Sequence, residues 1–224
     1  MNLSSNIGSR VKLILFDLDG TIIDSKDVIV ESFLVAAKTM GIKIDPVKIR
    51  MLIGYPLEEV VKGSLLERYD EYTIKKFISL RRKIMDELWP KKAKLFPDVI
   101  PTLKVLSKRY ILGIASSSIV TRITKILQHF GIKDYFKIVS GVREGIRGKP
   151  HPDVLLYALK SANVKNSEAI YVGDAEIDCI AARNAGIAFI WVKRENVVFR
   201  ECSPAYVLNS LTDLPRILGI SDFE

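Results

Sequence analysis

Short apolar runs alternate along most of the chain with segments in which apolar residues recur every three or four positions. A continuous apolar run is typical of a strand buried on both faces of a parallel sheet, and the longer spacing is typical of an amphipathic helix. The alternation predicts an α/β fold with a doubly wound parallel sheet, a Rossmann-like core. The predicted strands lie at residues 11–16, 110–115, 136–140, 169–173 and 187–192, and the predicted helices at residues 98–109, 118–130, 152–162 and 176–185.

Residues 24–95 interrupt this alternation, because they carry helical patterns and no convincing strand. The simplest interpretation is an all-helical cap domain inserted into a core that is formed by residues 1–23 and 96–224. An insert after the first strand is placed to cover a ligand at the carboxyl ends of the strands. Its helices are expected at residues 26–40, 46–53, 57–69 and 71–88.

Composition limits the class of protein. Of the 224 residues, 48% are hydrophobic and 27% are charged, which excludes a predominantly disordered chain. No apolar run reaches the ~18 residues of a membrane span, and the first ten residues lack the apolar segment of a secretory signal. We interpret Cys179 and Cys202 as isolated thiols in a reducing cytosol, and therefore expect a cytoplasmic protein without a membrane partner.

The net charge of +8 raises the question of a nucleic-acid partner. The basic residues are dispersed, and the densest stretch, residues 75–94, also contains Asp86 and Glu87. A nucleic-acid surface would need a basic stripe with stacking aromatic residues, and the sequence shows none. We therefore interpret the charge as a solvated lysine-rich surface and expect no nucleic-acid partner.

Two carboxylates follow the first predicted strand directly, in the segment Asp17-Leu18-Asp19-Gly20-Thr21. Extended geometry would point the carboxylates of Asp17 and Asp19 to opposite faces, but a turn that starts at Gly20 can bring them together. Two neighbouring carboxylates repel each other unless a cation or a shared proton offsets their charge, and paired oxygens suit Mg²⁺. The alternative is a turn without chemistry, because Asp and Gly are common after strands.

Three further signals lie at the ends of predicted strands or at the starts of the next helices. Ser116 follows an apolar run and is either a helix cap or part of an anion site. Lys149, which precedes Pro150, is either a positioned cation or an exposed loop residue. Asp174 and Asp178 are four positions apart, so that both can face the same sheet edge.

Together these residues supply carboxylates, a hydroxyl group and a lysine at the edge where a doubly wound sheet binds its ligands. This set fits metal-assisted phosphoryl transfer, in which a carboxylate attacks phosphorus and cations neutralise the phosphate oxygens. The sequence contains no GxxxxGK[ST] loop, no GxGxxG fingerprint and no GxSxG elbow.

The four motifs, in this order, resemble those of the haloacid dehalogenase-like hydrolase superfamily, and specifically its phosphatases with a helical cap. The resemblance covers essentially the whole chain and includes the segment at residues 95–97, where the cap of the family usually ends. The matching residues are Asp17, Asp19, Gly20 and Thr21 in the first motif, Ser116 in the second, Lys149 in the third, and Gly173, Asp174 and Asp178 in the fourth.

The resemblance implies a role for each residue. Asp17 would be the nucleophile that forms an aspartyl-phosphate, and Asp19 would be the general acid and then the general base. The family's dehalogenases lack the second aspartate, so Asp19 favours phosphate chemistry. Ser116 and Lys149 would hold the phosphate and contribute to catalysis. The groups around the phosphate would also include Gly20, Thr21 and Ser117.

The resemblance also implies Mg²⁺ as the cofactor. Asp17, the backbone carbonyl of Asp19, and Asp174 would bind the ion, and Asp178 would contribute directly or through water. The substrate would be a small-molecule phosphate ester, and the protein would be a monomer or a small homo-oligomer.

The cap segment from residue 53 to residue 59 resembles the substrate-specificity loop of phosphoglycolate phosphatase-like members, so Gly54 and Tyr55 are expected to contact the substrate. The alternative is a β-phosphoglucomutase-type enzyme, which shares all four motifs and carries a phosphate-binding arginine shortly after the matching glycine. Here Tyr-Pro-Leu-Glu follows that glycine, which favours a phosphatase. Asp98 departs from the family pattern, because a glycine is common at this position.

Overall fold

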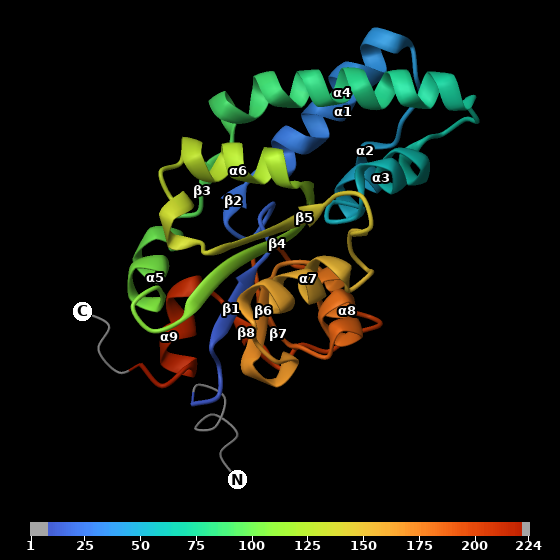
Figure 1. Ribbon diagram of the computed structural model, residues 1–224. Helices are drawn as coiled ribbons and strands as arrows, with labels where there is room; N and C mark the ends of the chain where they lie inside the picture. The colour runs from blue at the N-terminus through green and yellow to red at the C-terminus, as the bar shows by residue number, and fades with distance from the viewer. Residues whose placement is uncertain (1–8, 221–224) are drawn as a thin grey trace.

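The core of the protein is a six-stranded parallel sheet with the order β5-β4-β1-β6-β7-β8, seen in a computed structural model that describes residues 9–220 (Figure 1). The fold class is therefore the predicted one, and each predicted strand is present within a few residues of its expected bounds. β8 was not predicted, because three residues at a sheet edge are too short for a recognisable pattern. The strands are β1 (Leu13–Phe16), β4 (Ile111–Ile119), β5 (Ile138–Val142), β6 (Ala169–Gly173), β7 (Ala188–Val192) and β8 (Tyr206–Leu208).

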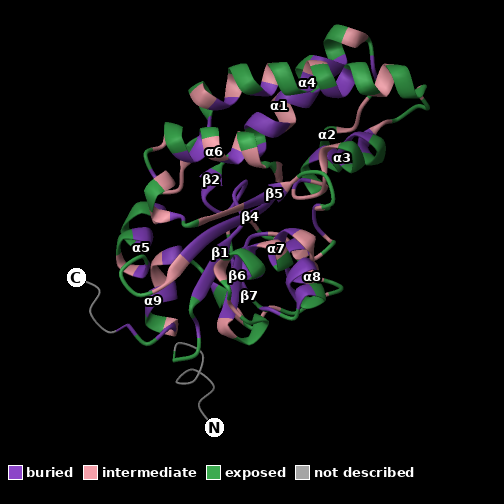
Figure 2. Ribbon diagram, in the orientation of Figure 1, coloured by how far each residue is buried: buried purple, intermediate pink, exposed green. Residues whose placement is uncertain are grey.

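Helices cover both faces of the sheet because alternate residues of each strand point to opposite sides. Leu13 and Leu15 of β1 pack with the helices α7 (Asp153–Ala162) and α8 (Glu176–Ala185). Ile14 and Phe16 point to the other face of the sheet. There they belong to a hydrophobic cluster with α5 (Val99–Leu106), α6 (Val120–His129) and α9 (Leu214–Ile217). The central strands are buried throughout (Figure 2), which explains their continuous apolar runs. Single turns of 3₁₀-helix lie at Lys133–Tyr135, Asn166–Glu168 and Leu211–Asp213.

Four helices follow β1 and lie together at one end of the sheet, away from α5 and α9 (Figure 1). Local signals set their ends: Gly41 closes the first helix in a left-handed conformation, and the side chains of Asp45 and Asp70 cap the second and the fourth. The fourth helix continues past its predicted end at residue 88 and contains Pro90. The helices are α1 (Lys26–Met40), α2 (Pro46–Met51), α3 (Leu57–Ser64) and α4 (Glu71–Lys92).

A small antiparallel ladder joins the two connections between these helices and the sheet. It pairs β2 (Ile23–Asp24) with β3 (Lys94–Leu95), at the two ends of the segment in which no strand was predicted. A strand of two residues is too short to show an alternation of apolar and polar positions. The two strands pair because the chain comes back from the inserted helices to the place where it left the sheet.

The interpretation of the cysteines as isolated thiols is wrong, because Cys179 and Cys202 form a disulfide. Cys179 lies buried on α8, and Cys202 lies in the segment between β7 and β8, with a Cα–Cα distance of 6.0 Å. The side chain of Glu176 accepts a hydrogen bond from the backbone N–H of Cys202, which holds that segment against the start of α8. The two cysteines are separated by 23 residues, and no sequence pattern indicates that they pair. Because they are not free thiols, they give no support to the expectation of a reducing compartment.

Among residues 9–220, no helix is both long and apolar enough to cross a membrane. The expected lack of a secretory signal concerns mainly residues 1–8, which lie outside the described residues.

Candidate active site

The residues singled out in the four motifs meet at the carboxyl ends of neighbouring strands. Asp17 follows β1, Ser116 lies in β4 and Asp174 follows β6, and both β4 and β6 pair in parallel with β1. The carboxyl ends of parallel strands lie at one edge, which brings together groups that are far apart in sequence. Lys149 arrives at the same edge from the connection between β5 and α7.

Lys149 is fully buried and is held by several groups. Its Nζ atom lies 2.7 Å from Oδ1 of Asp17 and also forms an ion pair with Asp178. Its backbone N–H donates to Oγ of Ser117 at 3.0 Å. Burial by itself would lower the pKa of this ammonium group, but the two carboxylates outweigh that effect and raise it. Lys149 is therefore a fixed positive charge beside the nucleophile predicted from the sequence.

Three buried carboxylates form a compact group beside this lysine. Asp17, Asp174 and Asp178 each offer an oxygen within 4.8 Å of the others. Burial, together with the charges of Asp178 and Asp174, raises the pKa of Asp17 to about 8, although Lys149 opposes the shift. Grouped carboxylate oxygens are the donor set that Mg²⁺ prefers, and a divalent cation would relieve their repulsion. The residues present thus fit a divalent metal.

The members of this group differ in how far their oxygens are already occupied. Asp178 accepts hydrogen bonds from Lys149, from the Tyr171 hydroxyl at 3.2 Å, and from the Ala175 N–H at 3.0 Å. Asp174 accepts one hydrogen bond, from Oγ1 of Thr21 at 2.7 Å, and its other oxygen lies 2.6 Å from Nζ of Lys26. The contacts of Asp178 suit a residue that orients Lys149, and those of Asp174 suit a metal ligand.

Asp19 points away from this group, toward α6. Its carboxylate accepts hydrogen bonds from Ser25 at 2.7 Å and from both terminal nitrogens of Arg122, at 2.9 and 3.1 Å. Burial would raise the pKa of Asp19, but the charge and hydrogen bonds of Arg122 lower it overall. The turn after Asp19 therefore does not bring the two carboxylates into one group, although both line the same pocket.

The residues predicted to bind phosphate lie in different places. Ser116 and Ser117 line the pocket together with Asp17 and Lys149. The N–H of Gly20 instead donates to the carbonyl of Ile23 at 2.8 Å, and the hydroxyl of Thr21 is bound to Asp174. In this structure Gly20 and Thr21 therefore support the loop and Asp174.

The pocket has a volume of about 220 Å³ and lies between the sheet edge and the inserted helices. Gly54 and Tyr55, on the connection between α2 and α3, line it opposite the aspartates. Gly54 has a φ of +108°, and a Cβ atom there would lie 2.9 Å from Ile177 of α8, so this connection packs closely on the core. The apolar part of the wall comes mainly from Ile29, Phe33, Val60 and Met85.

Sequence reasoning missed three basic residues of the site: Lys26, Arg81 and Arg122. Lys26 is the first residue of α1 and pairs with Asp174 and with Glu195, at 2.6 and 3.1 Å. Arg122 lies in the first turn of α6 and donates to the hydroxyl of Ser118 at the end of β4, a contact between two elements that no local spacing indicates. Arg81 stands in the middle of α4, far from every motif, and no local signal marks it.

A parallel α/β sheet with inserted helices over a pocket of aspartates and a buried lysine defines a class of phosphoryl-transfer hydrolases. The family model for haloacid dehalogenase-like hydrolases matches residues 14–192, and the chain belongs to that family. The resemblance recognised in the sequence is thus confirmed, and the chain is a phosphatase of this superfamily.

Named relatives support this assignment along nearly the whole chain. The chain is 30% identical to pyrophosphatase PpaX of Halalkalibacterium halodurans, over 94% of this chain and 98% of that one. It is 31% identical to pyrophosphatase PpaX of Bacillus velezensis, with the same coverage. Its fold matches the crystal structure of a predicted phosphoglycolate phosphatase from Haemophilus somnus with a TM-score of 0.84, at 24% identity over 93% of this chain and 98% of that one.

Proposed function

We propose that this protein hydrolyses a small phosphate monoester in a Mg²⁺-dependent reaction, through an aspartyl-phosphate on Asp17. The observation that carries the proposal is the convergence of Asp17, Ser116 and Lys149 on one pocket that Asp19 also lines, with Asp174 in the carboxylate group beside Asp17. Residues 24–95 act as its cap domain, and the proposed location is the cytoplasm. Asp17 and Asp174 would hold the metal with the carbonyl of Asp19, and Asp178 would support Lys149 and the ion from behind.

The first half of the reaction transfers the phosphoryl group to the protein. A carboxylate oxygen of Asp17 attacks phosphorus while the bond from phosphorus to the ester oxygen breaks. Asp19 would donate a proton to the departing oxygen, which leaves as an alcohol; this step needs the protonated form of Asp19, which the contact with Arg122 disfavours in the free protein. Lys149 and the hydroxyl of Ser116 neutralise and orient the phosphate oxygens. When bound, Mg²⁺ supplies further positive charge that offsets the repulsion between Asp17 and the phosphate.

The second half returns the protein to its starting state. Asp19, now a carboxylate, takes a proton from water, and the resulting hydroxide attacks phosphorus. The bond from phosphorus to Asp17 breaks, so that inorganic phosphate leaves and Asp19 is protonated for the next cycle. Ser25 and Arg122 bind the carboxylate of Asp19, which lines the same pocket as Asp17.

The test is phosphate release from a panel that contains p-nitrophenyl phosphate, phosphoglycolate and glucose phosphates, with and without Mg²⁺. We expect release that depends on Mg²⁺ and that falls by about 10⁴-fold or more in Asp17→Asn, because a carboxamide is a poor nucleophile. Circular dichroism of the variant shows whether the fold is kept. Full activity in a folded Asp17→Asn variant would contradict the aspartyl-phosphate mechanism.

Three finer activities are compared in the same panel. Inorganic pyrophosphate is included because relatives at 30 and 31% identity are named pyrophosphatases. The mutase alternative predicts isomerisation of a glucose phosphate with little phosphate released. The phosphoglycolate-like assignment predicts that phosphoglycolate is hydrolysed clearly faster than the other compounds. It is contradicted if phosphoglycolate is hydrolysed no faster than the esters that have no carboxylate, p-nitrophenyl phosphate and the glucose phosphates.

A further inference from the structure

Arg81 is a buried cation in the active-site pocket for which the described structure provides no direct counter-ion. It lies on α4 and lines the same pocket as Asp17 and Asp19. Its exposed fraction is 8%, and its Nε atom is buried without a hydrogen-bond partner. A buried, unpaired charge is costly in free energy, so a cation kept in this position indicates that a ligand supplies the negative charge.

The other basic side chains of the pocket are already paired. Lys149 contacts Asp17 and Asp178, and Arg122 makes a two-pronged contact with Asp19. Arg82, the neighbour of Arg81 on α4, pairs with Glu58 at 3.1 Å. Within residues 9–220, Arg81 alone among the basic residues lining the pocket forms no ion pair.

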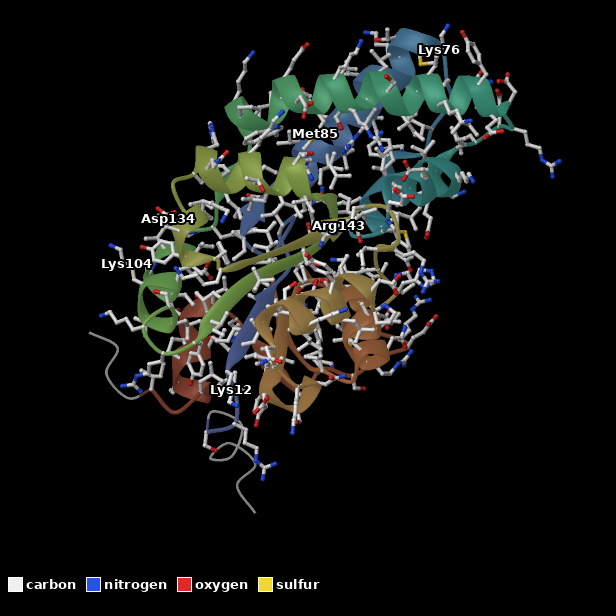
Figure 3. All side chains as sticks on the ribbon, viewed as in Figure 1. Lys12, Lys76, Met85, Lys104, Asp134 and Arg143 are labelled. Carbon is white, nitrogen blue, oxygen red and sulfur yellow. A yellow bond between two sulfur atoms is a disulfide. The ribbon has the colours of Figure 1, made fainter. Side chains whose placement is uncertain are left out.

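The surroundings of Arg81 hold its side chain in place. Its guanidinium group lies over the ring of Phe33, 4.6 Å from the centroid, which stabilises the cation without neutralising it. Met85, labelled in Figure 3, lies one helical turn farther along α4 and lines the same pocket. Burial and the positive charge of Arg122 lower the pKa of Arg81 to about 9, while the carboxylates of Asp19 and Asp86 oppose this shift. The group is therefore still mostly protonated at neutral pH.

Arg122 lines the same pocket and has one nitrogen without a partner in the described part of the chain. Its terminal nitrogens bind Asp19, but its Nε atom is buried and has no partner among the described residues. Arg81 comes from the inserted helices and Arg122 from the core, so an anion that meets both would bridge the two parts of the molecule. A guanidinium group binds phosphate and carboxylate equally well through paired N–H groups.

We propose that Arg81, assisted by Arg122, binds a second anionic group of the substrate, so that the substrate is a phosphate ester or anhydride with a further phosphate or carboxylate near the transferred phosphoryl group. This inference rests on the proposed function, because it takes Asp17 and Lys149 as the site of the transferred group. The pocket volume of about 220 Å³ favours a substrate in which a few atoms separate the two anions.

The experiment measures binding of stable analogues by calorimetry at a fixed Mg²⁺ concentration. Methylenediphosphonate carries a second phosphonate, phosphonoacetate carries a carboxylate, and methylphosphonate carries no second anion. We expect one or both of the analogues with a second anionic group to bind about 10- to 100-fold more tightly than methylphosphonate, the effect of one charged hydrogen-bonded pair. Arg81→Met should remove that preference, and Arg81→Lys should restore part of it. The tighter of the two analogues identifies the second group.

The matched control is Lys83→Met, which removes a positive charge from the exposed side of the same helix. It should keep the preference, since Lys83 does not line the pocket. Equal binding of all analogues to the wild-type protein, or an unchanged preference in folded Arg81→Met, would overturn the proposal. A preference that depends on Arg81, in a protein that releases no phosphate from any ester, would support the anion site and contradict the proposed function instead.

Discussion

Gly20 lies at the point where the loop after β1 passes closest to the carboxylate group of the site. Its φ is +91°, a conformation that side-chain-bearing residues rarely adopt. A Cβ atom at this position would lie 2.6 Å from Oδ2 of Asp174 and 2.6 Å from Cε of Lys26. The glycine therefore allows two parts of the site that are distant in sequence to approach each other.

Gly20→Ala should lower the free energy of unfolding by more than the backbone strain alone. Gly131→Ala is the matched control, because Gly131 also has a positive φ (+65°) but has no atom within 4 Å of its Cβ position. We expect about 1–2 kcal/mol from the left-handed conformation in the control, and about 1–3 kcal/mol more at Gly20 from displaced neighbours. Urea denaturation measures both, and equal losses would show that the crowding does not matter.

At the scale of the elements, Asp98, directly before α5, connects that helix to segments near the C-terminal part of the chain. Its carboxylate accepts two hydrogen bonds from Arg194, both at 2.8 Å, and others from Ser210 and from the N–H of Leu211. Arg194 also donates to the carbonyl of Thr21 at 3.0 Å, in the loop of the first motif. An aspartate at this departure from the family pattern thus has a structural reason, because it anchors three segments beside the active site.

Asp98→Ala should destabilise the protein by about 3 kcal/mol, because it leaves the buried Arg194 guanidinium without its partner. Thermal and urea unfolding measure the loss. The control is Glu71→Ala, which breaks the exposed ion pair of Glu71 with Lys75 and should leave stability unchanged within error. Similar effects of the two substitutions would contradict the role assigned to Asp98.

At the scale of the whole molecule, the buried carboxylates make folding stability depend on pH and on metal. The pKa of Asp17 is about 8 in the folded protein, against 3.8 for an aspartate side chain in water, so the folded state prefers the protonated form. The stability that this group contributes is fully present below pH 4 and is lost as pH rises through 8. The pKa of Asp174 is raised in the same direction. The lowered pKa values of Asp19 and Asp98 act at more acidic pH, below this window.

Without metal, the melting temperature should therefore fall between pH 5 and pH 8, and Asp17→Asn should flatten that dependence. Added Mg²⁺ should stabilise the wild-type protein at pH 8 by about 2.7 kcal/mol at a concentration one hundred times its dissociation constant, and by less at pH 5. Thermal melts in EDTA and in Mg²⁺ provide the comparison. Identical melting curves in the two conditions at pH 8 would contradict a divalent-metal site at these aspartates.

The sequence by itself determined five of the six strands of the core and the helices between them, but not β8 or α9, and it determined the residues at the carboxyl ends of those strands. Both depend on short-range features: an apolar run such as that before Asp17, a helical spacing, and a polar residue at the point where a strand ends. Because parallel strands end at one edge, those local features were enough to expect Asp17, Ser116 and Asp174 at that edge. In the structure Ser116 lines the pocket with Asp17, and Asp174 lies in the carboxylate group with Asp17.

Only the tertiary structure decided the contacts that depend on the return of the chain from a distance. These include Lys26 on Asp174, Arg122 on Asp19, Arg81 at the pocket wall, and the bond between Cys179 and Cys202. The three pairs join side chains that are separated by 23 residues or more. Arg81 belongs to no local sequence motif. No spacing rule describes such pairs, because their geometry is set by how helices and loops pack on the sheet.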